Sequence, residues 1–210
     1  MKKGTIPVRR CTEQFRSANF SAVADFRADV GERTITDIDI AALKVGHLFL
    51  GQAKVVIEPD SLYDRWKVLG KLHEAARQLD RTLEALPRFR DALLGRLGNE
   101  VKLEVIVPFI VTNSWQFTGI TVPSYPVVDF SYLAFLLSGA TPTAITARKE
   151  AIVIGNANSY IRGRQPTAEE MAQLIRRPIY EDSFPEGVRR LKLVKIGPYK
   201  IHLPFFEMEV

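Results

Sequence analysis

Apolar and polar residues alternate over two stretches near the N-terminus, which is the pattern of strands with one solvent-facing side. In the first stretch the apolar positions are Ala22, Ala24, Phe26, Ala28 and Val30. The second stretch, residues 36–57, contains two apolar segments separated by Val45 and Gly46. The pattern predicts a strand over residues 20–30, followed by a β-hairpin with a tight connection at Val45-Gly46.

Four charged or amide residues interrupt the apolar pattern of this hairpin. A connection of two or of four residues gives the same register, in which paired positions sum to 91. Asp39 then faces Gln52 and Asp37 faces Lys54, with directly opposed Cβ atoms about 4.5–5.5 Å apart. Because side chains alternate with a period of two, all four are expected on one face, whereas a connection of odd length would separate Asp39 from Gln52. The sequence therefore predicts a polar cluster of two carboxylates, an amide and an amine.

A long amphipathic helix is predicted directly after the hairpin. Apolar residues recur every three or four positions along it, with charged residues between them. Ser61 is a suitable N-cap because Asp64 follows three residues later, and Pro87 is expected to end the helix. Residues 88–97 are expected to add a short helix of their own.

Shorter elements complete the N-terminal two thirds of the chain. Residues 12–16 predict the start of a short helix before the first strand. Residues 101–112 are rich in β-branched side chains and predict a strand buried on both faces. Residues 126–128 predict another strand, which leads into a helix capped by Asp129 and stopped by Gly139.

The C-terminal residues carry two clear signals. The segment Thr167–Glu170 is a capping box and predicts a helix that continues to Arg177. Residues 188–196 and 199–206 flank a Gly-Pro pair and predict a terminal β-hairpin rich in Arg and Lys.

The composition changes near residue 140, which sets the predicted domain division. Residues 141–146 are linker-like, and residues 149–154 predict a short strand. We therefore expect a core domain over residues 1–140 and a small α+β accessory extension over residues 141–210. The extension could pack on the core, form a dimer contact or face a nucleic acid.

At Asp39 and the triplet Gln52-Ala53-Lys54 the chain resembles the PD-(D/E)XK nuclease superfamily, which has the restriction-endonuclease-like fold. That family carries an Asp on one strand and Glu-x-Lys on the next, after a short turn. Gln52 stands where most members have Glu, as it does in Mrr-type restriction enzymes. The resemblance covers roughly residues 20–140. It implies an α/β fold, with a mixed central sheet flanked by helices.

The resemblance also implies a chemistry, that of an endonuclease that hydrolyses phosphodiester bonds of DNA with magnesium or manganese. The metal ligands would be the Asp39 carboxylate, the Gln52 amide oxygen and the backbone carbonyl of Ala53. Lys54 would orient the attacking water or stabilise charge on the phosphate. Replacing Glu by Gln removes one negative charge, and Asp37 is the nearest carboxylate to compensate for it.

Composition and charge narrow the picture only slightly. The chain has 29 basic and 24 acidic residues, a net charge of +5 and a pI near 9.4, which is compatible with a polyanionic partner. Cys11 is the only cysteine, which excludes an internal disulfide and a cysteine-based zinc site, and the three histidines show no ligand spacing. There is no P-loop, no apolar signal core and no apolar run of the roughly 18–20 residues that a membrane helix requires. We therefore expect a cytoplasmic protein without membrane segments.

Three functions remain open at this point. The first is the magnesium-dependent deoxyribonuclease. The second is a catalytically inactive nuclease-fold module that binds nucleic acid or a protein partner. Gln52 in place of Glu favours this second function. The family often has an acidic residue in its first helix, and the only candidate for it here is Glu13, which favours the same function. The third is a structural homodimer that associates through the C-terminal hairpin. For the polar cluster itself the simplest explanation is an Asp37–Lys54 ion pair, with Asp39 and Gln52 hydrogen-bonded nearby.

Overall fold

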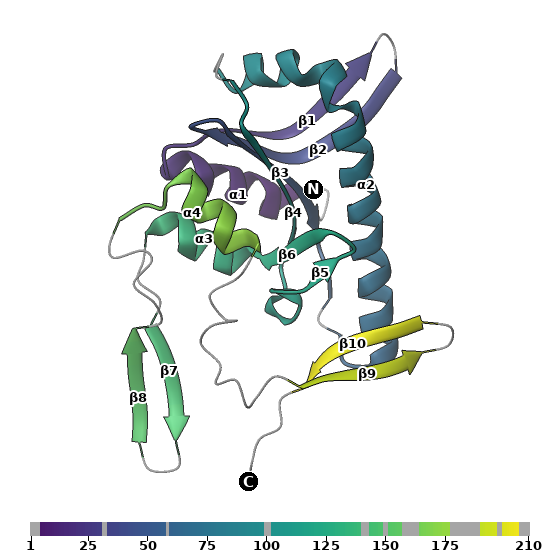
Figure 1. The fold of residues 1–210 in the computed structure, drawn as a ribbon, viewed down its shortest axis with the longest axis vertical. Helices are drawn as coiled ribbons and strands as arrows, with labels where there is room; N and C mark the ends of the chain where they lie inside the picture. Colours follow the sequence, from purple (N-terminus) through teal and green to yellow (C-terminus); the bar gives the residue numbers. More distant parts are fainter. Residues whose placement is uncertain are drawn as a thin grey trace.

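Six strands form one mixed sheet at the centre of the protein (Figure 1). The computed structural model describes residues 5–30, 33–57, 59–98, 102–139, 143–148, 151–156, 164–176, 190–196 and 199–205. The strands of the sheet are β1 (Ser21–Val30), β2 (Arg33–Lys44), β3 (His47–Lys54), β4 (Val105–Thr112), β5 (Thr121–Val122) and β6 (Tyr125–Asp129). Their order is β1-β2-β3-β4-β6-β5. The first three strands pair antiparallel, whereas β4 and β6 run parallel to β3. The predicted α/β class with a mixed sheet flanked by helices is confirmed.

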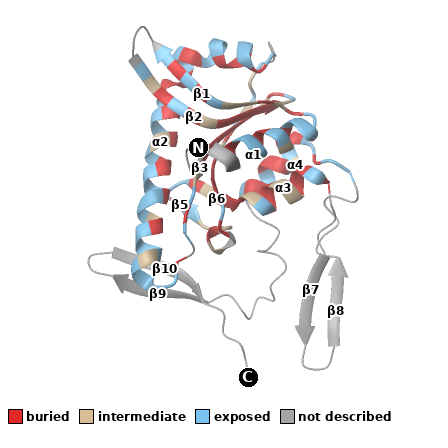
Figure 2. Cartoon of the chain, turned by 180° about the vertical axis from the view of Figure 1, so that it is seen from behind, coloured by how far each residue is buried: buried red, intermediate tan, exposed pale blue. Residues whose placement is uncertain are grey.

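Helices cover both faces of the sheet. They are α1 (Thr5–Ser17), α2 (Leu62–Arg96), α3 (Phe130–Ser138) and α4 (Ala168–Arg176), with a short 3-10 helix η1 (Trp115–Phe117). Buried side chains of α1, α3 and α4 share one apolar cluster with one face of the sheet. Buried side chains of α2 form two clusters on the other face, one over β1 to β3 and one over β4 to β6. In Figure 2 the buried positions of α2 accordingly alternate with exposed ones along the helix.

The predicted register of the β2–β3 hairpin is confirmed. The ladder pairs Lys44 with His47 and continues to Ile40 with Gly51, so that paired positions sum to 91. The connection has two residues, Val45 and Gly46, and both have positive φ, at 44° and 72°. Two positive φ values are what a tight type I′ hairpin turn requires.

Side-chain alternation breaks in the middle of β1, and here the sequence prediction is wrong. Ala22 packs on the α1 side of the sheet, but Phe26 and Ala28 pack on the α2 side. The cause is Asp25, whose φ of 51° lies in the left-handed region, where a strand loses its regular pleat. The predicted single apolar face of β1 is therefore divided between the two cores.

Side-chain alternation is also broken in β2, opposite the break in β1, and this changes the side of the strand on which Asp37 lies. Ile40 packs on the α1 side and Ile38 on the α2 side, although regular alternation would put both on one face. Thr36 also points towards α2, because its hydroxyl lies 2.7 Å from that of Thr82 on that helix. With Thr36 and Ile38 directed to α2, the intervening Asp37 leaves the strand on the opposite side. The predicted single face of Asp37, Asp39, Ala41 and Leu43 is therefore broken, because Ala41 and Leu43 pack on the α2 side.

Helix α2 begins as predicted but ends later. Ser61 is its N-cap and accepts a hydrogen bond from the backbone N–H of Asp64. Pro87 lies inside the helix rather than after it, so the separate helix predicted for residues 88–97 is part of α2. Proline removes one backbone donor, but residues on both sides of it, such as Leu86 and Phe89, are buried against the sheet and hold the two halves together.

Beyond residue 140 the structure describes one helix and two hairpins. The hairpin strands are β7 (Thr143–Arg148), β8 (Ala151–Asn156), β9 (Arg190–Ile196) and β10 (Tyr199–Phe205). The capping box of α4 is confirmed, since Glu170 accepts from the Thr167 N–H and donates its own N–H to the Thr167 hydroxyl. Residues predicted as a linker form β7, and the predicted helix end at Arg177 lies outside the described residues.

Helix α4 packs in the same cluster as α1 and α3, so the apolar core extends past residue 140. The division into two domains stays a prediction.

Candidate functional site

Asp39 links β2 to β3 through its side chain. The regular ladder between these strands ends at Ile40 and Gly51. One residue further on, Oδ2 of Asp39 accepts a hydrogen bond from the backbone N–H of Ala53 at 2.7 Å. Beyond the end of the backbone ladder, the Asp39 carboxylate therefore accepts the hydrogen bond from β3. This bond holds Asp39 next to the Gln52-Ala53-Lys54 triplet.

The side chain of Gln52 is held in one orientation by a hydrogen bond to β2. Its side chain is only 2% exposed, and its Nε2 donates to the backbone carbonyl of Asp37 at 2.7 Å. A carbonyl oxygen can only accept, so the nitrogen of the Gln52 amide must point at Asp37. The amide oxygen, Oε1, is then the atom left to act as an acceptor or as a ligand.

The environment of Asp39 disfavours its charge. Burial raises the pKa of the carboxyl from its ordinary 3.8 to about 6, and the neighbouring carboxylates of Asp37 and Asp25 act in the same direction. The hydrogen bond from Ala53 and the Lys54 ammonium oppose the rise without cancelling it. At pH 7 the group is still ionised by about ten to one. A partly buried anion with further anions beside it is a place where a cation would be stabilised.

The three parallel strands end side by side next to this cluster. Lys54 of β3 pairs with Thr112 of β4, which pairs with Asp129 of β6. Asp129 is fully engaged, because it caps α3 through the Tyr132 N–H and accepts from the Thr118 hydroxyl. The carboxyl ends of parallel strands are where open α/β sheets bind ligands. Of the two charged groups in this row, Lys54 is therefore the one available to a ligand.

Two expected contacts are not found in the described part of the chain. Neither of its two ion pairs, Arg90–Asp91 and Arg164–Glu170, involves Lys54, so the Asp37–Lys54 ion pair is not formed. Glu13 lies exposed on α1, and the charged groups that act on Asp39 come from β1, β2 and β3 instead. Within the same residues no three His, Cys, Asp or Glu side chains are grouped closely enough to hold a metal ion.

Sequence reasoning missed Asp25 and Thr82, and it did not single out Gln78 among the polar residues of the long helix. Asp25 is the residue of β1 that faces Asp39, and this pair is the one that the β1–β2 ladder omits. The pairing depends on the register shift between Ala28 and Asp29, which the sequence does not show. Gln78 and Thr82 lie on α2, where the Gln78 Oε1 is buried without a hydrogen-bond partner and Thr82 binds Thr36. Nothing in the sequence distinguishes them from other polar residues of that helix.

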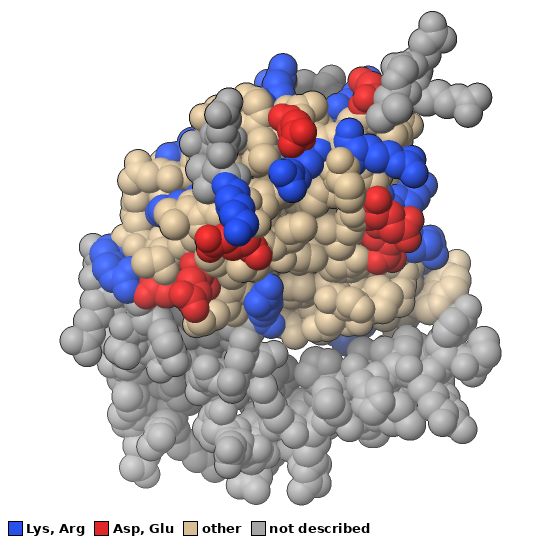
Figure 3. Space-filling view, turned by 45° about the horizontal axis from the view of Figure 1, so that its top comes forward, with Lys and Arg blue, Asp and Glu red and all other residues tan. Residues whose placement is uncertain are grey.

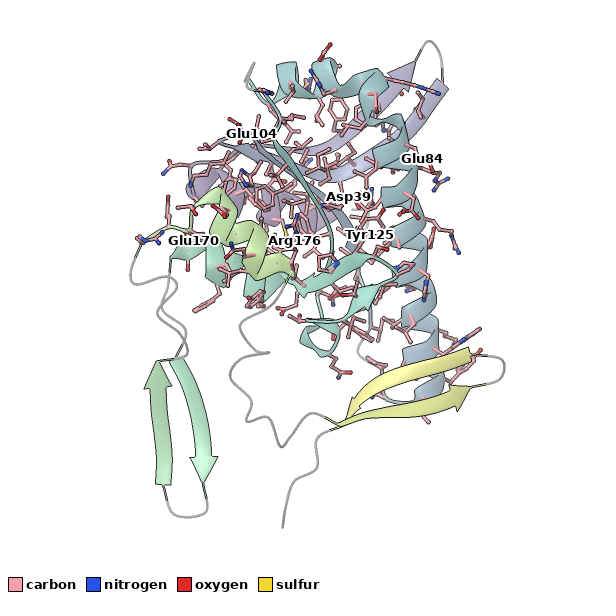
Figure 4. All side chains as sticks on the ribbon, in the orientation of Figure 1. Asp39, Glu84, Glu104, Tyr125, Glu170 and Arg176 are labelled. Carbon is pink, nitrogen blue, oxygen red and sulfur yellow. The ribbon has the colours of Figure 1, made fainter. Side chains whose placement is uncertain are left out.

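The figures show where Asp39 lies and how charge is distributed on one face of the protein. Figure 4 shows Asp39 near the centre of the molecule, with Glu84 on the α2 side. Basic and acidic side chains are interspersed over the face seen in Figure 3, without a large patch of one sign. A polyanion would therefore be bound on this face by individual groups rather than by one broad field.

No protein-family model matches the chain, and neither does any curated protein. In the described residues, none of the helices has the length and hydrophobicity needed to cross a bilayer.

Proposed function

We propose that the protein is a metal-dependent phosphodiester hydrolase that acts on DNA, with its reactive site at Asp39, Gln52, Ala53 and Lys54. The observation that carries the proposal is the hydrogen bond from the Ala53 N–H to Asp39, which brings the two halves of the motif together. The order helix, three-stranded meander, long helix and parallel strand, from α1 to β4, agrees with the restriction-endonuclease-like fold that the motif suggests. A cytoplasmic location is part of the proposal and accords with a single buried thiol, Cys11.

The oxygen atoms of this site are of the chemical type that a magnesium ion binds. Magnesium prefers hard oxygen ligands, uses one or two carboxylates and keeps several waters. The Asp39 carboxylate, the Gln52 Oε1 and the Ala53 carbonyl would hold it. When bound, the ion would polarise the scissile phosphate and make hydroxide available near neutral pH.

The residues themselves have separable tasks. Asp39 supplies the negative charge, and its bond to Ala53 keeps that charge beside the triplet. Gln52 supplies a neutral oxygen whose direction is set by the bond to Asp37. Lys54 lies at the end of β3 and would place a positive charge against the phosphate oxygens in the transition state.

A second candidate is the inactive module that binds nucleic acid or a protein partner. The observation that favours it is Gln52, since a neutral amide in place of a carboxylate weakens metal binding. Such a protein would bind DNA in a salt-dependent way without cutting it.

The test is cleavage of supercoiled plasmid and single-stranded DNA in magnesium, in manganese and in chelator. Wild type is compared with Lys54→Ala and with the matched control Lys102→Ala, an exposed lysine that precedes β4. We expect wild type and Lys102→Ala to cleave, and chelator or Lys54→Ala to abolish cleavage. Equal cleavage by Lys54→Ala would refute the assigned site. No cleavage by wild type in either metal would favour the inactive module.

A further inference from the structure

Exposed apolar side chains concentrate at the start of α2. Seven large apolar side chains of the described residues are exposed: Val45, Val55, Ile57, Leu62, Tyr63, Trp66 and Ile106. Five of them fall between residues 55 and 66. Single exposed apolar residues are ordinary, but a group of this kind marks an interaction surface.

Two aromatic rings in this group are already stacked on one another. The rings of Tyr63 and Trp66 have centroids 6.1 Å apart and planes 17° from parallel. The Nζ of Lys67 lies 4.2 Å from the centroid of the Tyr63 ring. Positions three and four apart share one face of a helix, so all three side chains stand together. We call Tyr63, Trp66 and Lys67 the aromatic patch.

Both rings of the aromatic patch remain exposed to solvent despite their stacking. Tyr63 is 62% and Trp66 44% exposed. Their phenol and indole rings are large, rigid surfaces that gain most when a second flat group covers them. The flat partner must also tolerate the ammonium of Lys67, which favours an anionic ligand.

Other charges on this turn of α2 point to the same class of ligand. Arg65 and Lys71 are exposed near the patch, and neither of the ion pairs of the described residues uses them or Lys67. The nearby carboxylate of Asp64 is committed to the helix N-cap, where it accepts from the Ser61 hydroxyl. The combination is an aromatic stack with three cations nearby, Arg65, Lys67 and Lys71, while Asp60 and Glu74 are exposed further along the chain on either side.

The aromatic patch is also close in sequence to the candidate site. Helix α2 begins at Leu62, eight positions after Lys54, and the connection is held by Asn113, which bonds both the N–H and the carbonyl of Val56. A nucleic-acid strand bound at the carboxyl ends of β3 and β4 would pass close to the first turns of α2 where it extends beyond the sheet.

We propose that the aromatic patch binds an unpaired nucleobase, and that the nucleic acid recognised by this protein contains a single-stranded segment. Base–aromatic stacking with a cation nearby is how single strands are bound without regard to sequence. A base pair inside a duplex has both faces covered by its neighbours and cannot stack on the patch. The proposal deepens the proposed function by naming the form of its substrate, but the binding requires neither metal nor cleavage.

The test is the anisotropy of a labelled oligothymidine of about 16 nucleotides, measured in chelator so that cleavage plays no part. We expect wild type to bind it more tightly than a duplex of the same length. Trp66→Ala and Tyr63→Ala should each weaken binding about tenfold, whereas Trp66→Phe, which keeps a ring, should weaken it less. Ile106→Ala removes an exposed apolar side chain elsewhere and should leave binding unchanged.

Salt dependence and fluorescence give independent readouts. Lys67→Gln should reduce the slope of log affinity against log salt by about 0.7, the value for one contact with a single-stranded phosphate. In a Trp115→Phe background Trp66 is the remaining tryptophan, and its emission should be quenched by the oligonucleotide. Circular dichroism of each variant separates loss of binding from loss of fold.

Four results would overturn the inference. They are absence of single-strand binding by wild type, unchanged binding by Trp66→Ala, equal binding of the duplex, and a wild-type dimer that Trp66→Ala dissociates in sedimentation. Failure of the nuclease proposal looks different: oligonucleotide binding that depends on Trp66 would persist while no DNA is cut in either metal.

Discussion

Replacing Asp39 by Asn is expected to make the protein more stable at neutral pH while abolishing cleavage. The amide has nearly the same shape, and its oxygen can still accept the hydrogen bond from Ala53. What it removes is a negative charge that burial and two neighbouring carboxylates disfavour. The substitution therefore separates the effect of the Asp39 charge on stability from its effect on cleavage.

The magnitude follows from the pKa of Asp39. A rise from 3.8 to about 6 means that the folded state binds the proton more tightly than the unfolded state does. One pKa unit is about 1.36 kcal/mol, so the full cost of the charge is about 3 kcal/mol. Asp39 retains some contact with water, which reduces this figure, and we expect a gain of about 1–3 kcal/mol for Asn. The cost is absent below the unfolded pKa, grows as the pH rises towards about 6 and is constant above it.

The assay is urea unfolding of wild type and Asp39→Asn in chelator at pH 7.5 and pH 4.5. The gain at pH 4.5 should be about a third of the gain at pH 7.5. Asp91→Asn is the matched control, because Asp91 is fully exposed beside Arg90 and its charge should contribute less than about 0.5 kcal/mol. Magnesium should then stabilise wild type, by about 1.4 kcal/mol at ten times its dissociation constant, and leave Asp39→Asn unchanged.

Two results would refute this reasoning. A gain of the same size at both pH values would mean that it does not arise from the charge of Asp39. A loss of stability at pH 7.5 would mean that Lys54 and the Ala53 N–H stabilise the carboxylate more than burial disfavours it. Stabilisation of both proteins by magnesium would remove Asp39 from the set of metal ligands without touching the pKa argument.

Three further substitutions test the packing around the site, each measured by urea unfolding. Gly51→Ala should lower the free energy of unfolding by about 1–3 kcal/mol, because the new Cβ would lie 2.7 Å from the Cζ of the buried Phe109 ring. The control is Gly70→Ala on α2, whose new Cβ meets no atom within 4 Å and should leave stability unchanged or raise it. Glu170→Ala should cost about 1 kcal/mol, because it removes half of the capping box of α4. Asp25→Val should be about 1–2 kcal/mol less stable than Asp25→Gly, because glycine adopts a φ of 51° without strain and a β-branched residue does not. Equal stability of the two variants would show that the left-handed conformation is not required.

The parts of the fold that follow from local rules could be predicted from the sequence. The register of the β2–β3 hairpin depends on loop length alone, so two strands and two turn residues determined it. The caps at Ser61 and Thr167 each need only a side chain and a backbone N–H a few residues away. Pro87 could not be placed correctly, because a proline ends a helix or is tolerated inside one depending on how much apolar surface continues beyond it, and that surface is provided by distant strands.

The break at Asp25 could not be predicted for a different reason, and it bears on the site itself. The left-handed Asp25 accompanies a change in the core against which the side chains of β1 pack, and the sequence shows only an unbroken alternation. Because Asp25 faces Asp39, the break lies beside the point where the β2–β3 ladder ends, whereas β1 and β2 resume pairing at Phe26 and Ile38. A regular ladder would use the N–H of Ala53 for a backbone partner, and its interruption leaves that N–H to the Asp39 carboxylate. Irregularities of this kind re-aim side chains next to functional sites in many sheets. The irregularity that defeats the sequence pattern therefore lies beside the hydrogen bond that fixes Asp39 against the Gln-x-Lys triplet. The negative charge around Asp39 comes from Asp25 and Asp37 rather than from Glu13 on α1.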